Sequence, residues 1–216
     1  MLANKLMKEK TRREHGIRYS PRREENRNMI KSKKDLKLYL QEDKKALHRN
    51  TKYPAFQDSV WKYEILLRKC EFYNNVSGFF NKILLVYYKY KKFKMGQKTG
   101  IQIPINVFGK GLSIAHPGPI IVNSAAKVGD YCRIHVGVNI GTAAGNQLRV
   151  PEIGNNVYIG PGAKIFGQIH IADNVAIGAN AVVNKDVLTP SVTVAGVPAK
   201  IISNKGSHGL LYSPET

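Results

Sequence analysis

Residues 153–187 read IGNNVYIGPGAKIFGQIHIADNVAIGANAVVNKDV, and this stretch repeats with a period of six. Every sixth residue from the first isoleucine is aliphatic: Ile153, Ile159, Ile165, Ile171, Ile177 and Val183. A second apolar phase lies four residues later in each repeat: Val157, Ala163, Ile169, Val175, Ala181 and Val187. Helical periodicity and strand alternation do not give two fixed apolar phases in six residues, whereas a chain that turns a corner every six residues does. The pattern predicts a parallel β-helix, whose coils bury a core only by stacking, with short sandwich strands as the alternative.

The positive charge of the chain is concentrated in its N-terminal part. The 216 residues carry a net charge of +19, and residues 1–98 hold 26 Lys and Arg against 10 Asp and Glu. Such an asymmetry suggests an acidic partner: an anionic membrane face, a nucleic acid or an anionic substrate. A short basic tract alone is weak evidence for nucleic acid, which we do not expect as a partner.

The cysteines and the apolar runs bear on the cellular compartment. Cys70 and Cys132 form no CxxC pair, and two cysteines so far apart favour a reducing cytosol over a disulfide framework. The first ten residues contain no apolar run typical of a signal peptide, and the most apolar stretch, residues 83–88, is too short to span a bilayer. We expect a cytoplasmic protein, at most peripheral at the inner face of the membrane.

Composition divides the chain into four parts. Residues 1–32 are a basic arm, too poor in apolar groups to bury much surface. Residues 33–98 form an α-helical region, with helices predicted from about 33, over 59–73 behind a cap at Asp58 or Ser59, and over 79–93. Residues 99–202 form the β-helix, with a polar, Gly-rich loop at 142–152, and residues 203–216 form a tail.

The lysines that close the helix over 79–93 allow two interpretations. The first is a helical cap over the open end of the β-helix with a solvated basic edge. The second is a contact with an anionic membrane surface, where each clustered Lys or Arg adds about 1 kcal/mol.

Two histidines lie where the coil could support chemistry. His116 sits in a turn rich in Pro and Gly, and His135 follows one coil later, so that stacking would place them about 4.8 Å apart. An imidazole is suited to removing a proton from a hydroxyl near neutral pH. Cys, Asp and Glu form no cluster with these histidines in the sequence, which therefore predicts no metal site.

The six-residue repeat, the His-Pro-Gly turn at His116 and the ending AGVPAK at 195–200 resemble those of the hexapeptide acyltransferases. Residues 112–202 are most similar to serine O-acetyltransferases and to the O-acetyltransferases of surface polysaccharide assembly. The resemblance implies a mostly β fold with α-helices: a left-handed parallel β-helix preceded by an α-helical region. It also implies a homotrimer, in some relatives a dimer of trimers, with acetyl-CoA lying between neighbouring β-helices.

The resemblance assigns roles to individual residues. His116 would deprotonate the acceptor hydroxyl, His135 would assist it, and backbone N–H groups would stabilise the oxyanion. Arg149 and Asn139 would bind the acceptor. The residues implied to contact acetyl-CoA are Pro161, Gly162, Ala163, Ala179, Asn184, Lys185 and Lys200. Small residues would let the pantetheine arm approach the backbone, and the lysines would pair with phosphates.

The sequence departs from the serine enzymes beside the catalytic histidine. Ile101 and Ala115 occupy positions where those enzymes carry aspartates. Because a site for free serine needs charged partners for the ammonium and the carboxylate, we expect the acceptor to be a sugar hydroxyl of a small or lipid-linked saccharide in surface polysaccharide assembly. The first alternative is a serine O-acetyltransferase of cysteine biosynthesis. The second is a non-catalytic β-helix scaffold that binds an anionic surface.

Overall fold

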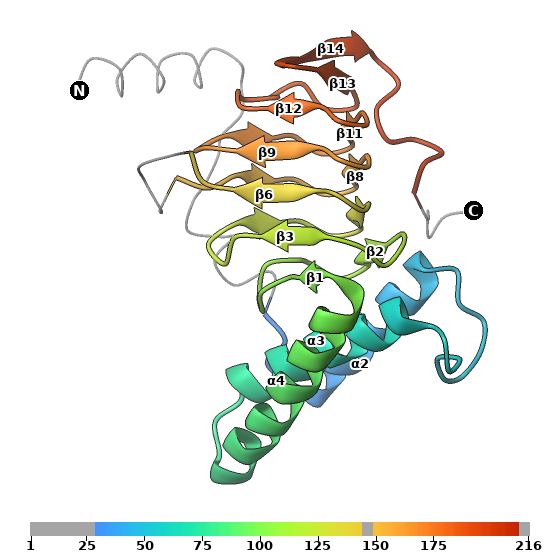
Figure 1. Cartoon of the computed structure of the whole chain (residues 1–216), viewed down its shortest axis with the longest axis vertical. Helices are drawn as coiled ribbons and strands as arrows, with labels where there is room; N and C mark the ends of the chain where they lie inside the picture. Colours follow the sequence, from blue (N-terminus) through green and yellow to red (C-terminus); the bar gives the residue numbers. More distant parts are fainter. Residues whose placement is uncertain (1–28, 144–148, 212–216) are drawn as a thin grey trace.

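The structure, a computed structural model, describes residues 29–143 and 149–211. Three helices precede a stack of short strands that forms a three-sided coil (Figure 1). The predicted arm at 1–32 lies mostly outside the described residues, as do the middle of the 142–152 loop and the last five residues of the tail.

The helices begin and end at residues whose chemistry explains their bounds. Helix α2 spans Lys33–Ala46 and α3 spans Ser59–Asn75; the side chains of Ser32 and Asp58 cap them by accepting backbone N–H bonds. Helix α4 spans Phe79–Thr99, six residues further than predicted. Its lysine-rich end contains good helix formers, and the helix stops only at Gly100, whose left-handed conformation (φ 78°) suits a glycine.

The strands are short, each two to five residues long. Their bounds are β1 Ile101–Gln102, β2 Ser113–Ile114, β3 Ile120–Val122, β4 Lys127–Val128, β5 Arg133–Ile134, β6 Asn139–Gly141, β7 Glu152–Ile153, β8 Tyr158–Ile159, β9 Lys164–Phe166, β10 His170–Ile171, β11 Ala176–Ile177, β12 Val182–Val183, β13 Thr193–Gly196 and β14 Ala199–Ser203.

These strands stack into three sheets, which are the sides of the coil. Side 1 contains β1, β3, β6, β9 and β12; side 2 contains β4, β7 and β10; side 3 contains β2, β5, β8, β11, β13 and β14. All pairs are parallel except β13 with β14. The fold is therefore the predicted left-handed parallel β-helix preceded by helices.

The period of six in the sequence corresponds to one side of the coil. Tyr158 pairs with Ala176 and Lys164 with Val182, so one complete turn takes 18 residues. The repeated isoleucines and valines of residues 153–187 are buried in the core. Lys127 of β4 pairs with Glu152 of β7, 25 residues later, which is seven more than a regular turn of 18. The predicted loop between sides 1 and 2 accommodates these seven extra residues.

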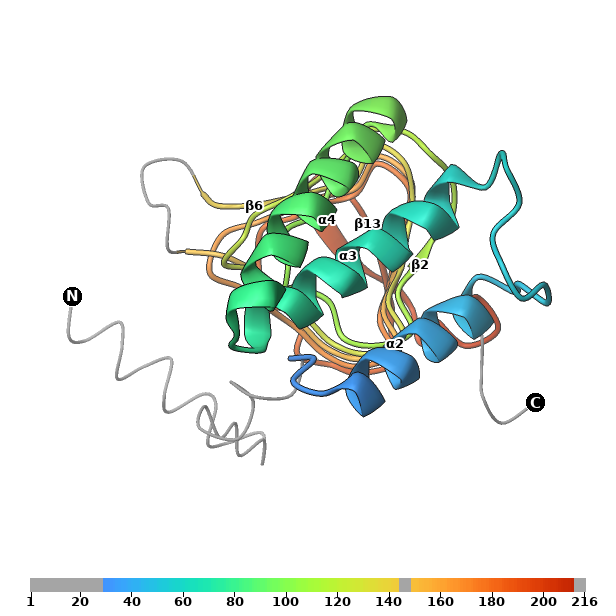
Figure 2. The ribbon, with the colours of Figure 1, turned by 90° about the horizontal axis from the view of Figure 1, so that it is seen from below.

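The helices cover the open end of the coil. Seen along the coil, α3 crosses the opening, and α4 runs beside it to the start of β1 (Figure 2). Trp61, Tyr63 and Leu67 of α3 belong to the same buried cluster as the coil isoleucines. This arrangement corresponds to the first of the two interpretations of the helical region, a cap over the open end of the β-helix.

Candidate functional site at one corner of the coil

The corner between side 3 and side 1 carries the predicted catalytic histidines, and we call it the His116 corner. It consists of the turns at residues 115–119, 135–138, 160–163 and 178–181. In the first turn, the paired residues Ile114 and Val122 lie eight residues apart, whereas their partners Ile134 and Ile140 lie six apart. The two extra residues push this turn outward, which leaves His116 exposed.

His135 lies directly beside this turn on the next coil. The N–H of Ala115 donates to the carbonyl oxygen of Ile134 (3.0 Å), which aligns His116 with the residues that follow β5. The His135 ring packs on Tyr158, with ring centroids 5.0 Å apart. Its Nε2 atom is buried and has no hydrogen-bond partner within the described part of the chain.

The charge state of the two histidines is linked. Burial, followed by the positive charges of Arg133 and His116, lowers the pKa of His135 below its usual 6.5. The lowered pKa favours the neutral form of His135 near pH 7. The pair suits the removal of one proton from a hydroxyl group.

Glycines form the rest of the corner and leave its backbone accessible. Gly137 and Gly162 have φ values of 80° and 75°, a region that side chains rarely adopt. A Cβ on Gly162 would lie 2.0 Å from Oδ1 of Asn180, and a Cβ on Gly118 would lie 2.2 Å from a methyl group of Val136. Nothing larger than glycine fits at these two positions, so a ligand along the corner would meet the main chain.

The residues implied to bind acetyl-CoA fall into two groups. Pro161, Gly162 and Ala179 lie on the His116 corner, and Lys200 of β14 pairs with Ala195 of β13 at its far end. Four strand steps separate β2 from β13, which corresponds to about 19 Å along the corner. Exposed Asn184 and Lys185 instead follow β12, at the corner between sides 1 and 2.

Ala163 and Asn139 differ in what they offer a ligand. The side chain of Ala163 is fully buried and its carbonyl oxygen accepts the N–H of Asn139 (3.0 Å), so Ala163 contributes to the core. Asn139 is half-buried at the start of β6, just after the His116 corner. Exposed Arg149 follows β6 and lies between sides 1 and 2, at a different corner of the coil from His116.

A buried polar network, which the sequence analysis missed, ties the helices to the first coil. Three carboxylates accept backbone N–H bonds: Asp43 from Leu112, Glu64 from Ile114, and Glu71 from Asn106 (2.8–3.0 Å). Burial, and then the negative charge of Asp43, raise the pKa of Glu64 well above 4.5. Because Ile114 ends the strand before the His116 turn, this network fixes the strand that carries the site.

Arg68 is the centre of this network. It is fully buried, bonds Asp43 through two nitrogens (2.7 and 3.2 Å) and Glu71 through a third contact (2.9 Å), and donates to the carbonyl oxygen of Phe108. The sequence signal was the spacing of Glu64, Arg68 and Glu71 at four and three residues within an apolar helix.

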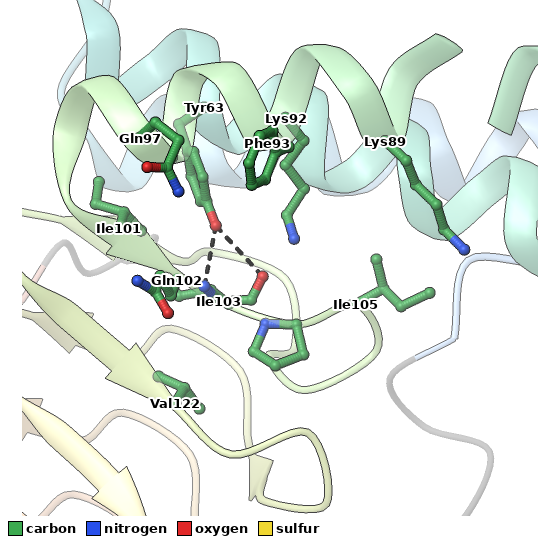
Figure 3. Close-up of a pocket in the computed structure, with 12 residues that line it drawn as sticks. Tyr63, Lys89, Lys92, Phe93, Gln97, Ile101, Gln102, Ile103, Ile105 and Val122 are labelled. Carbon is green, nitrogen blue, oxygen red and sulfur yellow. Dashed lines mark hydrogen bonds between the residues drawn. The ribbon is translucent and has the colours of Figure 1, made fainter. Parts of the chain in front are cut away.

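A hollow of about 550 Å³ lies between α4, Tyr63 and the start of the coil (Figure 3). The hydroxyl of Tyr63 spans its floor, accepting the N–H of Ile103 (3.0 Å) and donating to the carbonyl oxygen of the same residue (3.3 Å). None of the residues predicted to form the site lines it. Elsewhere in residues 29–143 and 149–211, no group of three or more His, Cys, Asp or Glu side chains could hold a metal ion.

Comparisons with known proteins identify this kind of coil. Residues 151–185 match the family model described as bacterial transferase hexapeptide (six repeats). Over 111 residues, half of this chain, the sequence is 43% identical to serine acetyltransferase from Synechococcus elongatus, and the match covers 45% of that protein. The β-helix is therefore similar to hexapeptide-repeat transferases and to serine acetyltransferases.

Solved structures agree with this identification. Serine acetyltransferase from Brucella abortus in complex with coenzyme A is 29% identical, with a TM-score of 0.59, covering 79% of this chain and 67% of that one. The Neisseria gonorrhoeae enzyme in complex with serine is 26% identical, with a TM-score of 0.60, covering 80% and 71%. The chain spans about half the length of the first curated serine acetyltransferases that it matches.

These relatives correct the expected acceptor. We expected a saccharide of surface polysaccharide assembly, because Ile101 and Ala115 replace aspartates. The relatives at 42–43% identity and the structural neighbours are all named serine acetyltransferases, which overturns that expectation in favour of the serine alternative. Missing carboxylates at two positions were weak grounds, because other residues around the site can supply the contacts of an acceptor.

Proposed function

We propose that this protein is a serine O-acetyltransferase that transfers the acetyl group of acetyl-CoA to the hydroxyl of L-serine. The observation that carries the proposal is the similarity to serine acetyltransferases in both sequence and structure. One neighbour is in complex with coenzyme A and another with serine; in the proposed reaction serine is the acceptor and coenzyme A is the product left by acetyl-CoA.

The His116 corner supplies a base for this reaction. His116 takes the proton of the serine hydroxyl, and the hydroxyl oxygen attacks the thioester carbonyl of acetyl-CoA. As the tetrahedral intermediate collapses, the C–S bond breaks, and the CoA thiolate receives the proton from His116. The products are O-acetyl-L-serine and CoA. Neutral His135 adds no second positive charge beside His116 when His116 takes up this proton.

Acetyl-CoA fits the corner by shape and charge. The glycine turns allow a pantetheine arm to lie against the main chain, and Lys200 at the far end offers an ammonium to the phosphates. In this proposal Ala163 acts as core packing beneath the arm. Asn184 and Lys185 lie at another corner, so they contact CoA only when the CoA molecule lies between the β-helices of two chains.

Recognition of serine needs a second copy of the chain. Ile101 is fully buried in the core and cannot orient His116, and Ala115 has no charge. Arg149, a partner for the serine carboxylate, lies at the next corner of the same coil. We propose a homotrimer in which Arg149 of a neighbouring chain reaches His116.

The first test is release of CoA thiol from acetyl-CoA by the purified full-length protein, with and without L-serine. We expect release that depends on serine and falls at least about 100-fold in His116→Ala. His208→Ala, which removes an exposed histidine far along the chain, should leave the rate unchanged. Release without serine dependence, or full activity of His116→Ala, would overturn the proposal.

A further inference from the structure

Helix α4 carries large apolar side chains on its outer face. Phe79, Ile83, Val86, Tyr90 and Phe93, which we call the α4 stripe, follow one another at helical spacing and are 54–73% exposed. Figure 1 shows that α4 begins away from the coil and returns to it at β1. A continuous apolar stripe on an exposed helix indicates a surface that is covered by a partner.

The charges of α4 are all positive. The helix contains six lysines and no Asp or Glu: Lys82, Lys89, Lys91, Lys92, Lys94 and Lys98. At 100° per residue, Lys82 and Lys89 lie on one flank of the stripe, and Lys91 and Lys98 lie on the other. In the part of the chain that the structure describes, no lysine of α4 forms a salt bridge.

The hollow of Figure 3 adjoins one flank of the stripe. Lys89, Lys92 and Phe93 line it from α4, and apolar residues of the first coil, including Ile103 and Ile105, line it from the other side. The ammonium of Lys92 lies near the ring of Tyr63 (5.8 Å from its centroid) rather than beside a carboxylate. Lys89 and Lys92, which form no salt bridge with any described residue, thus lie between the α4 stripe and the apolar residues of the first coil turn. This arrangement suits a phosphate attached to an acyl chain.

We propose that the α4 stripe docks on an anionic phospholipid surface, with its apolar side chains at the acyl boundary and its lysines among the phosphates. No helix among the described residues is long and apolar enough to cross a membrane, so α4 lies in the interface. A second copy of this chain is disfavoured as the occupant. Two stripes facing each other would oppose six lysines to six, and residues 99–216, with 8 Lys and Arg against 5 Asp and Glu, carry a net positive charge as well. This inference is independent of the acyl transfer.

Sedimentation with vesicles tests the lysines. The full-length protein should bind vesicles of phosphatidylcholine and phosphatidylglycerol, bind pure phosphatidylcholine weakly, and lose binding at high salt. Lys89→Gln, Lys91→Gln and Lys94→Gln together should weaken binding roughly 100-fold. Lys33→Gln, Lys34→Gln and Lys37→Gln, at exposed positions of α2, change the net charge equally and should weaken vesicle binding far less. An equal loss in both triple variants would overturn the proposal, because net charge alone would then explain binding.

A second set of variants tests the stripe. Ile83→Gln, Val86→Gln and Tyr90→Gln should abolish vesicle binding and leave the circular dichroism spectrum unchanged, because these side chains are exposed. Phe56→Gln with Ile202→Gln, exposed residues elsewhere, should bind as the unaltered protein does. Vesicle binding that survives in the stripe variant would overturn the proposal. So would a smaller assembly in sedimentation velocity without vesicles, because a second copy would then cover the stripe.

Discussion

The buried Nε2 of His135 has no hydrogen-bond partner in the described part of the chain, which makes this residue the most informative single side chain of the site. A buried imidazole without a partner costs free energy in its neutral form and more in its charged form. The cost is tolerated beside His116, because a neutral neighbour adds no positive charge where His116 takes up a proton. The burial of Nε2 of His135 therefore bears on the chemistry of His116.

The lowered pKa of His135 predicts how stability depends on pH. Between the folded pKa and 6.5, the unfolded chain binds more protons than the folded protein. Stability therefore rises with pH across this window, and it falls as the pH drops below 6.5. In His135→Gln this contribution disappears, and the plot of unfolding free energy against pH becomes flatter.

Urea unfolding at pH values on both sides of 6.5 measures this slope. His208→Gln serves as the control, because its side chain is exposed and should leave the slope unchanged. A slope in His135→Gln equal to that of the unaltered protein would show that the ring of His135 does not lose its solvation on folding.

At the scale of elements, the helices position the site through charge as well as through apolar packing. Arg68 of α3 holds Asp43 of α2 and the carbonyl oxygen of Phe108 in the first coil. The edge of a β-helix exposes unpaired N–H and C=O groups, and this network pairs several of them. Removing one member would leave buried charges without partners.

Arg68→Met is expected to destabilise the protein by about 3–5 kcal/mol, because Asp43 and Glu71 would remain buried and unpaired. Arg49→Met is the matched control: Arg49 makes an ion pair of the same length with Asp58 (2.7 Å), but on the surface. Its loss should cost no more than about 1 kcal/mol. Denaturant unfolding measures both changes, and equal losses would contradict the structural role of Arg68.

The elements also show which features a single sequence can predict. The coil was predictable because each six-residue repeat contains its own buried aliphatic residues, such as Ile159, Ile165 and Ile171. The true end of α4 depended on the conformation of Gly100, and the partners of Glu64 lie 50 residues away in sequence at Ile114. His116 and His135 were predicted to be neighbours from coil spacing, whereas nothing local indicated that Arg149 lies at another corner.

At the scale of the whole molecule, the proposed site is divided between chains. A three-sided coil presents its corners in different directions: the base lies at the His116 corner, between sides 3 and 1, whereas Arg149 lies between sides 1 and 2. Closed rotation of three copies brings one corner of each chain to the next corner of its neighbour. The active unit of the proposed enzyme is then an interface.

Mixing inactive chains tests this division. His116→Ala and Arg149→Ala should each be nearly inactive alone, whereas the two chains co-expressed should recover about a quarter of the serine-dependent activity, since random assembly pairs an intact His116 with a neighbour's intact Arg149 at about one interface in four. His116→Ala co-expressed with a chain carrying both substitutions has no complete interface and should stay inactive. If Arg149 serves the His116 of its own chain, neither mixture recovers activity, and that result would contradict a site divided between chains.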